Sequence, residues 1–510
     1  MKDPCLTPFR QDLTAQDSFT LTFELVPSRG GRSTSFDRAL DFARKAAADG
    51  RIQAVSITEN AGGHPALSPE VMGLEIRKTG LEVIIHLSCK DKNRNQLESL
   101  LFAWDRHQLN NLLVITGDYP QQGYRGHAKP VFDLDSVQTL NLISRLNCEE
   151  GQDRRNPAMK NVQPTSFCKG VAVSPFKTSE AELLMQYGKL HRKINAGAQF
   201  IITQVGYDAR KFHELIQYMK QHELNLPLLG NVFIPSPRVA QLMIDGTIPG
   251  IIIPPILRDQ WLMELKKPDR GRRDALSRGA GLLAILKGLG YAGAHIGGPG
   301  IKFEELDFIL TEAERMSTQW QERLTDFKSW PDDAFFYYEK DPDSELNTPQ
   351  PSPRTSGSAM KSFQFADWFH RVFFSPKGTL YNPTRRVALY LDDSSWANTV
   401  ATLEHLIKLP LFGCRNCGDC TLAELGYRCP QQGCAKYLLN GPCGGSRDGW
   451  CEVYPGKKKC FYLTVYDQFV RTGKGTEITK GFIPPRDWSL NKTSSWLNFF
   501  ANRDHHNNLK

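Results

Sequence analysis

The sequence predicts an α/β fold class: a (β/α)8 TIM barrel followed by a smaller cysteine-rich, metal-binding α+β domain. Short apolar segments alternate with amphipathic helical segments through the first two thirds of the chain, with connections too short for antiparallel returns. Eight such units most often close into a barrel. Eight of the twelve cysteines then crowd into residues 414–460. A doubly wound open sheet is the alternative, but residues 27–31 match its glycine-rich first turn poorly.

Nine segments have the length and composition of strands, and each ends near a turn residue. They are residues 18–26, 53–58, 82–88, 112–115, 169–174, 199–205, 227–233, 250–254 and 293–296. The segment 112–115 (LLVI) is a continuous apolar run between helical stretches, which is typical of a parallel strand buried on both faces. It runs straight into Thr116, Gly117 and Asp118, so Asp118 is expected at the carboxyl end of this strand.

Helical segments separate these strands, and their apolar spacing predicts where they lie. Ser35 is expected to cap the first of them. The predicted helices are residues 36–48, 69–79, 93–109, 135–147, 180–196, 209–222, 237–244, 273–289 and 303–327. Residues 341–361 are rich in Pro, Ser and Thr, as linkers are. The expected organisation is therefore a barrel over residues 1–335, a linker over 336–362 and a cysteine-rich domain over 363–510.

The composition excludes several function classes. A net charge of +8 is spread over small, interrupted basic patches without interleaved aromatic residues, which predicts no nucleic-acid binding. No apolar run approaches 18 residues, and the polar start of the chain does not resemble a secretion signal. We therefore expect no membrane span and a cytoplasmic location.

Polar side chains stand at the carboxyl ends of six predicted strands, where packed strands carry apolar ones. They are Glu24, Thr58, His86, Asp118, Ser174 and Gln204. Any one of them alone is more often an ordinary hydrogen-bonding residue, but barrel closure brings these ends to one concave mouth. Because Phe23 and Leu25 flank Glu24, we expect burial to raise its pKa and make it a general acid, while Asp118 stays ionised.

Several short motifs then identify a family. FELVPSRGG, VSIT, IIHLSC, TGDYP and KINAGAQFIITQ, in this order, resemble the methylenetetrahydrofolate reductase family over roughly residues 19–327. The resemblance implies a barrel in which FMN (or FAD) passes hydride to 5,10-methylenetetrahydrofolate, giving 5-methyltetrahydrofolate. It implies catalytic roles for Glu24 as the acid, Asp118 beside flavin and folate, and Gln204 against the pterin. It implies cofactor contacts at Thr58, Ala61, His86, Gly117, Asp118, Arg192 and Lys193.

The chain also departs from that family's pattern. Thr116 stands where the bacterial enzymes have an arginine, and Ser174 and Thr178 replace a tyrosine and a histidine. Residues 297–300 (GGPG) replace the last strand's stretch from tyrosine to arginine. Loops after the last barrel strands are common phosphate sites, so we expect this glycine-rich loop to hold the flavin phosphate.

The cysteine cluster predicts metal. In a chain of this size without a secretion signal, clustered thiols point to metal ligation rather than disulfides. The eight predicted ligands can make two four-thiolate sites: Cys414, Cys417, Cys420, Cys429, Cys434, Cys443, Cys451 and Cys460. The C-x2-C-x2-C start resembles iron-sulfur ligation, and Zn²⁺ accepts the same ligands.

A second resemblance covers roughly residues 363–468. CRNCGDC, NGPCGG, GWCEV and KKKC resemble the small zinc- or cluster-binding subunit that accompanies the reductase in acetogenic bacteria. It implies that electrons can arrive from a redox protein partner of the ferredoxin type rather than directly from NAD(P)H.

The leading hypothesis is a methylenetetrahydrofolate reductase with a C-terminal domain for electron relay or partner docking. Two alternatives stay open. One is a flavin-free, folate-binding methyltransferase that passes a methyl group to a corrinoid or a thiol. The other is a non-catalytic scaffold with a structural zinc domain. The oligomeric state is open too, and oligomers are compatible with all three hypotheses.

Overall fold

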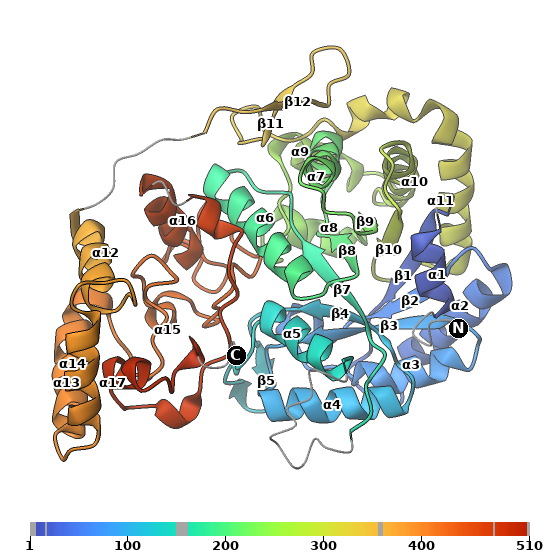
Figure 1. Cartoon of the computed structure of the whole chain (residues 1–510). Helices are drawn as coiled ribbons and strands as arrows, with labels where there is room; N and C mark the ends of the chain where they lie inside the picture. The colour runs from blue at the N-terminus through green and yellow to red at the C-terminus, as the bar shows by residue number, and fades with distance from the viewer. Residues whose placement is uncertain (1–6, 16–17, 149–161, 355–360, 473–474, 507–510) are drawn as a thin grey trace.

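The fold is described by a computed structural model covering residues 7–15, 18–148, 162–354, 361–472 and 475–506 (Figure 1). Eight parallel strands close into a barrel in the order β1-β10-β9-β8-β7-β4-β3-β2. Their bounds are β1 Thr20–Leu25, β2 Ala54–Ile57, β3 Glu82–Ser88, β4 Asn111–Ile115, β7 Cys168–Val173, β8 Phe200–Thr203, β9 Leu228–Phe233 and β10 Gly293–Gly297. The predicted fold class, a (β/α)8 barrel followed by a cysteine-containing domain, is confirmed.

Helices surround the barrel and bury their apolar faces against it. They are α2 Thr34–Asp49, α3 Pro69–Arg77, α4 Arg94–Arg106, α5 Ser136–Leu146, α6 Glu180–Asn195, α7 Ala209–Gln221, α8 Pro237–Ile244, α9 Pro255–Glu264, α10 Arg272–Gly288 and α11 Phe303–Met316, which continues as η4 Ser317–Phe327. The predicted cap of α2 is wrong by two residues. Ser33, not Ser35, is the N-cap, and its hydroxyl accepts from the Phe36 N–H.

The predicted strand over residues 250–254 is wrong. Strands β9 and β10 pair directly with each other over five residues, so the closed barrel offers no edge for another strand between them. Ile251 and Ile253 instead pack with Tyr207 and Trp261 in a small cluster outside the barrel. Their burial satisfies the apolar pattern without strand pairing.

A short helix, α1 (Pro8–Thr14), contributes to the packing inside the barrel. Its Phe9 and Leu13 are buried with strand residues that point into the barrel, and the ring of Phe9 meets Phe200 edge to face at 5.6 Å. Gly170 leaves the space that the Phe200 ring fills, because a Cβ there would lie 2.1 Å from it. The sequence showed only a polar, proline-broken leader here, so this helix was not predicted.

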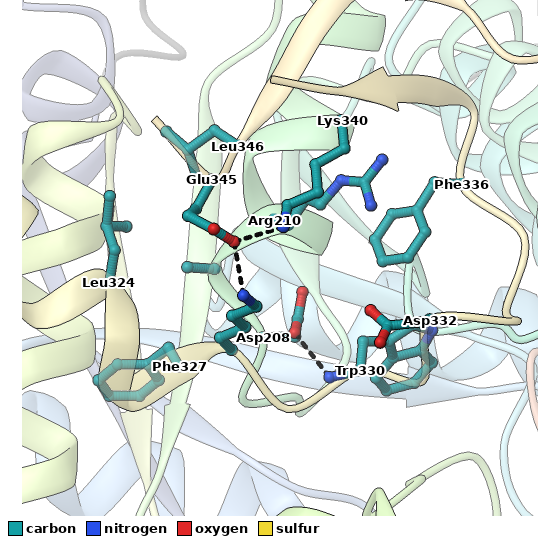
Figure 2. A pocket seen from close by; sticks show the side chains of 12 residues that line it. Asp208, Arg210, Leu324, Phe327, Trp330, Asp332, Phe336, Lys340, Glu345 and Leu346 are labelled. Carbon is teal, nitrogen blue, oxygen red and sulfur yellow. Dashed lines mark hydrogen bonds and ion pairs between the residues drawn. The ribbon is translucent and has the colours of Figure 1, made fainter. Parts of the chain in front are cut away.

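Part of the predicted linker is ordered against the barrel. Strands β11 (Tyr338–Lys340) and β12 (Asn347–Pro351) form an antiparallel hairpin, and Asn347 donates to the Arg210 carbonyl of α7. Figure 2 shows the adjoining pocket, where Glu345 forms ion pairs with Lys328 (2.8 Å) and Lys340 (2.6 Å). Residues 355–360 of the predicted linker lie outside the described residues.

The second domain packs against α6 of the barrel (Figure 1). Its helices are α12 Lys361–Phe373, α13 Tyr381–Asp392, α14 Ala397–Phe412, α15 Pro430–Gly433, α16 Phe461–Arg471 and α17 Ser495–Phe500, with 3-10 turns η5 Gly475–Ile478 and η6 Trp488–Leu490. Isolated β-bridges join Trp450 to Arg447 and Lys459. Helices α12, α13 and α14 form the layer farthest from the barrel and expose large apolar side chains, among them Trp368, Tyr390 and Leu406.

One buried carboxylate joins the two domains. Asp135 caps α5 through Oδ1, which accepts from the N–H groups of Val137 (2.9 Å) and Gln138 (3.1 Å). Its Oδ2 accepts from the backbone N–H groups of Leu439 (3.1 Å) and Asn440 (2.8 Å) in the second domain. The same carboxylate therefore fixes both the start of a barrel helix and the chain just before Cys443.

We expect Asp135→Asn to loosen the domain contact. The amide would point a donor at N–H groups that need an acceptor, at a cost of about 3 kcal/mol in the free energy of unfolding. Hydrogen-exchange mass spectrometry should show faster exchange in residues 438–446. The control is Asp208→Asn, since Asp208 is an equally buried cap whose Oδ2 binds the backbone of Ser329 and Trp330 within the barrel unit. Equal exchange in residues 438–446 of both variants would contradict the assignment.

Candidate active site

A cavity of about 290 Å³ lies at the carboxyl ends of the barrel strands. It brings together most of the barrel residues that the sequence singled out: Glu24, Thr58, Ala61, His86, Gly117, Asp118, Ser174, Lys193 and Gln204. Residues of the second domain complete its wall, among them Lys436, Cys443 and Glu452. The cavity is thus a chamber between two domains rather than an open barrel mouth.

Arg192 is not among the residues that line this cavity. Its guanidinium donates to the Lys480 carbonyl, from Nε at 3.2 Å and from Nη2 at 3.0 Å. Its neighbour Lys193 does face the cavity, and its ammonium group donates to the Ala172 carbonyl at 2.6 Å. Of the two predicted cationic contacts to the cofactor, the structure brings only Lys193 to the cavity.

The glycine-rich stretch 297–300, at the end of β10, does not contribute to the lining of the cavity either. Among the described residues that line the cavity, none comes from 297–300. Gly297 instead provides close packing, because a Cβ there would lie 3.1 Å from the Cβ of Glu24. The expectation that this loop holds a phosphate in the cavity has no geometric support.

Glu24 lies beside a histidine that the sequence analysis did not single out. His295 on β10 is buried, its Nδ1 lies 2.8 Å from Thr22 Oγ1, and its Nε2 lies 3.6 Å from Glu24 Oε2. Burial works to raise the pKa of Glu24, but His295 and, more weakly, His86 outweigh it, so the pKa is lowered. The expectation of a raised pKa for Glu24 is therefore wrong.

Asp118 shows the opposite shift. Burial raises its pKa, and the nearby Lys436 opposes this only in part. Its Oδ2 accepts from the Gly62 N–H at 2.8 Å, which fixes the carboxyl group against the short turn after β2. The two carboxyl groups thus differ in environment as expected, but the directions of their pKa shifts are the reverse of those expected. His86 stays neutral near pH 7, because burial lowers its pKa to about 4.

Apart from Glu452, whose Oε1 forms an ion pair with Lys436, four side chains that line the cavity hold buried polar atoms without a hydrogen-bond partner among the described residues. They are Thr58 Oγ1, Ser174 Oγ, Gln186 Nε2 and Asn231 Oδ1. Buried polar groups in proteins are nearly always paired, so a set of unpaired ones around one cavity indicates a polar ligand. Both donors and acceptors are present, as a heteroaromatic ring with carbonyl and N–H groups requires.

The roof of the cavity is the Cys443 loop, residues 440–445. Lys189 donates to the Pro442 carbonyl at 2.9 Å, and Lys177 donates to the Gly444 carbonyl at 2.6 Å. From the roof side, Lys436 donates to the Gly117 carbonyl at 2.7 Å and forms a buried ion pair with Glu452. These lysines were not predicted, because their partners are backbone carbonyls more than 200 residues away in the chain.

The second half of the cysteines gathers beside this roof. Cys434, Cys443, Cys451 and Cys460 line one hollow of about 20 Å³, and Cys443 also lines the main cavity. The first half, Cys414, Cys417, Cys420 and Cys429, gathers near two cations: Lys408 Nζ lies 3.7 Å from Cys420 Sγ, and Arg486 Nη1 lies 3.1 Å from Cys417 Sγ. The described cysteines form no disulfides.

The thiol groups are spaced more widely than zinc requires. Tetrahedral zinc holds sulfur atoms about 3.8 Å apart, given Zn–S bonds of about 2.3 Å. Within the described chain, the groups of three or more ligand atoms that all lie within 4.8 Å of one another contain no cysteine. Burial raises the pKa of the Cys443 thiol to about 12, so this sulfur ionises only when a cation binds it.

The helices of the described residues are all too short or too polar to cross a membrane.

Comparison with known proteins gives matches for both parts of the chain. The family described as methylenetetrahydrofolate reductase matches residues 9–284, and the family described as methylene-tetrahydrofolate reductase C terminal matches residues 395–489. The 5,10-methylenetetrahydrofolate reductase of Salmonella typhimurium is 24% identical over 199 residues, 39% of this chain and 58% of the relative. Methylenetetrahydrofolate reductase 1 of Schizosaccharomyces pombe is 23% identical over 264 residues, 51% of this chain and 40% of the relative.

A solved structure from Clostridium thermocellum, described as an uncharacterized protein that binds two copies of 5-methyl-5,6,7,8-tetrahydrofolic acid, aligns with 61% of this chain and 100% of its own. Its sequence is 13% identical to this chain, and the TM-score is 0.42. The chain spans about half the length of the curated relatives it matches. Because the first family match covers more than half of the chain, the protein belongs to the methylenetetrahydrofolate reductase family.

Proposed function

We propose that this protein is a cytoplasmic reductase that interconverts 5,10-methylenetetrahydrofolate and 5-methyltetrahydrofolate. Its barrel unit (residues 1–335) would bind folate and flavin, and its cysteine-rich unit (residues 363–510) would supply electrons. The observation that carries the proposal is one cavity lined by Glu24, Asp118 and Gln204 from the barrel and by Cys443 from the other domain.

The cavity fits a flavin ring. Its unpaired donors and acceptors on Thr58, Ser174, Gln186 and Asn231 are complementary to the polar edge of such a ring, and its volume is near the lower end of ligand pockets. Lys193 is the cavity cation suited to the phosphate of FMN or FAD, since Arg192 is bound elsewhere. When bound, the flavin supplies hydride to the methylene carbon of the folate.

The chain's own residues would activate the folate. Protonation of a ring nitrogen breaks its bond to the methylene carbon and leaves an iminium ion, which hydride reduces to the methyl group. Because His295 lowers the pKa of Glu24, we assign the proton to the Glu24 and His295 pair rather than to an isolated glutamic acid. Gln204 can bind the pterin, since its Oε1 accepts from the Val205 N–H and its amide group donates to no residue in the described part of the chain.

For the eight cysteines we propose iron-sulfur clusters rather than zinc. The sulfur atoms are spaced more widely than in a zinc site, and an iron-sulfur cluster, which binds each thiolate through a different iron atom, holds its sulfur ligands farther apart than a single ion does. Cationic side chains near the thiols, including Lys408, Arg486 and Lys436, balance the charge of an anionic cluster. A cluster held by Cys443 would pass electrons across the wall of the folate cavity.

We propose a redox protein as the electron donor, as in the acetogen-type complexes that the C-terminal part resembles. The exposed apolar side chains of helices α12, α13 and α14 support this, because such surfaces commonly bind proteins. Direct reduction by NAD(P)H is the alternative. Anaerobic turnover with reduced ferredoxin but not with NADH or NADPH would support the protein donor, and the reverse pattern would exclude it.

We expect Glu24→Gln to lower folate turnover by about 10²- to 10⁴-fold, the contribution of a general acid, while bound flavin absorbance stays unchanged. Anaerobic turnover with a chemical reductant measures the first, and the visible spectrum of the purified protein the second. Glu82→Gln is the control, since Glu82 stands at the opposite end of a barrel strand and binds Asn111. Near-normal turnover of Glu24→Gln would remove Glu24 from the mechanism. A colourless wild-type protein would favour the flavin-free methyltransferase.

We expect Lys193→Met to stabilise the ligand-free protein at low pH. Burial, with help from Lys189, lowers the pKa of Lys193 to about 7, so below pH 7 the folded state carries a buried charge at a cost. Between pH 7 and about 10.5 the unfolded state retains a proton that the folded state has lost, so wild-type stability gains with rising pH. The variant should therefore melt a few degrees higher at pH 6, and the difference should shrink towards pH 10. Exposed Lys129→Met is the control, and a pH-independent difference would contradict the prediction.

We expect Cys443→Ser to lose the iron of one thiol set, about half of the total, after anaerobic purification. It should abolish turnover with a protein donor because the cluster nearest to the cavity is missing. Iron and acid-labile sulfide analysis measures the loss, with Cys148→Ser, an exposed cysteine outside both sets, as the control. Zinc in place of iron in the wild type would refute the relay and favour a structural metal.

A further inference from the structure

A cluster of histidine and carboxylate side chains lies beside the first cysteine set and plays no part in the chemistry above. Glu424, His505 and His506 each place one ligand atom within 4.8 Å of the others. Glu424 follows Cys420 by four residues, whereas the two histidines come from the end of the described chain. The fold therefore brings the C-terminal segment back onto the first cysteine loop.

The ring of His505 is fixed by a buried carboxylate. Its Nδ1 lies 2.5 Å from Asp419 Oδ1, and its backbone N–H donates to the same oxygen at 3.2 Å. Its Nε2 is buried and has no hydrogen-bond partner among the described residues, although Glu424 Oε1 lies 3.5 Å away. An unpaired, buried ring nitrogen on a side chain that is 2% exposed needs a partner.

His506 repeats this arrangement. Its Nδ1 lies 3.0 Å from Asp504 Oδ2, and its Nε2 lies 2.8 Å from Glu424 Oε1. The other oxygen of Glu424, Oε2, is buried and also has no partner among the described residues. Two imidazole rings thus have Nδ1 held by a carboxylate and Nε2 directed at one shared carboxylate.

We propose that Glu424, His505 and His506 bind one divalent transition-metal ion, with zinc as the best fit. Histidine ligands of metals typically donate their second ring N–H to a carboxylate, as Asp419 and Asp504 allow here. Tetrahedral zinc with Zn–N and Zn–O bonds of about 2.0–2.1 Å holds its ligand atoms about 3.3 Å apart. The 2.8 and 3.5 Å separations around Glu424 Oε1 bracket that value.

The ion would fasten the end of the chain to the first cysteine loop. Asp419 lies between Cys417 and Cys420, and its Oδ2 accepts from the Asp487 N–H at 3.0 Å. An ion on His505 would therefore be linked through Asp419 to the loop that presents these two cysteines. The site is separate from the folate cavity, and its test does not depend on the proposed reaction.

The test is zinc binding by the full-length protein, purified anaerobically and dialysed against Zn²⁺ at a free concentration set by a chelator. Zinc, iron and sulfide are counted together. We expect one zinc per wild-type chain, lost in His506→Gln with iron unchanged, and a 10- to 100-fold weaker affinity in Asp504→Asn. Zinc-edge X-ray absorption should show nitrogen and oxygen neighbours at about 2.0–2.1 Å and no sulfur at about 2.3 Å.

The matched control is His127→Gln, since His127 is an exposed histidine on the short strand β6 (Gly126–His127). It should keep the wild-type zinc content. Equal zinc in wild type and His506→Gln, or no zinc in either, would overturn the proposal. Sulfur-bound zinc in both proteins would count against the iron-sulfur clusters and not against this site, which is decided by the zinc that His506→Gln loses relative to wild type. If His506→Gln loses iron and fails to fold, Glu424→Gln, which keeps the side-chain volume, decides by the same measurement.

Discussion

The buried carboxylate of Asp135 is the contact on which the candidate site depends. Two backbone N–H groups at the start of α5 and two more in the second domain all direct their hydrogen atoms at it. The Cys443 loop that follows has few apolar side chains of its own to bury. It is held instead by ammonium groups of the barrel, which donate to its carbonyls. The cavity exists as a chamber because the polar backbone of one domain is satisfied by the other.

Much of the barrel could be predicted from the sequence. Eight of the nine predicted strand segments are strands, because a buried parallel strand needs a short apolar run, and such a run is easy to recognise in the sequence. Residues 250–254 form a similar apolar run without being a strand, since an apolar run indicates burial and not hydrogen bonding to a neighbouring strand. Helix α1 gave no recognisable signal in the sequence, because two buried side chains in seven residues are too few to show the apolar spacing of a helix. Helices α12, α13 and α14 were missed because their faces are only partly buried.

Most of the barrel residues of the candidate site were predictable from the sequence, but the electrostatics of the site were not. The carboxyl ends of the strands converge in a barrel, so Glu24, Asp118 and Gln204 were expected to lie around one cavity. The direction of each pKa shift depends instead on charged neighbours from distant parts of the chain. His295 stands in a segment that the sequence marked only as a strand, and Lys436 comes from the other domain. A histidine inside an otherwise apolar strand, as in GAHI, was the one local signal that could have found the first.

The position of Cys443 in both the thiol hollow and the cavity wall has a consequence for the order of events in catalysis. A diffusible nicotinamide and folate would have to enter the same cavity, so the two would bind and leave alternately during the cycle. A redox centre bound by Cys443 in the cavity wall does not need to enter the cavity. In the proposed enzyme the pterin can therefore stay bound while electrons arrive through the wall of the cavity.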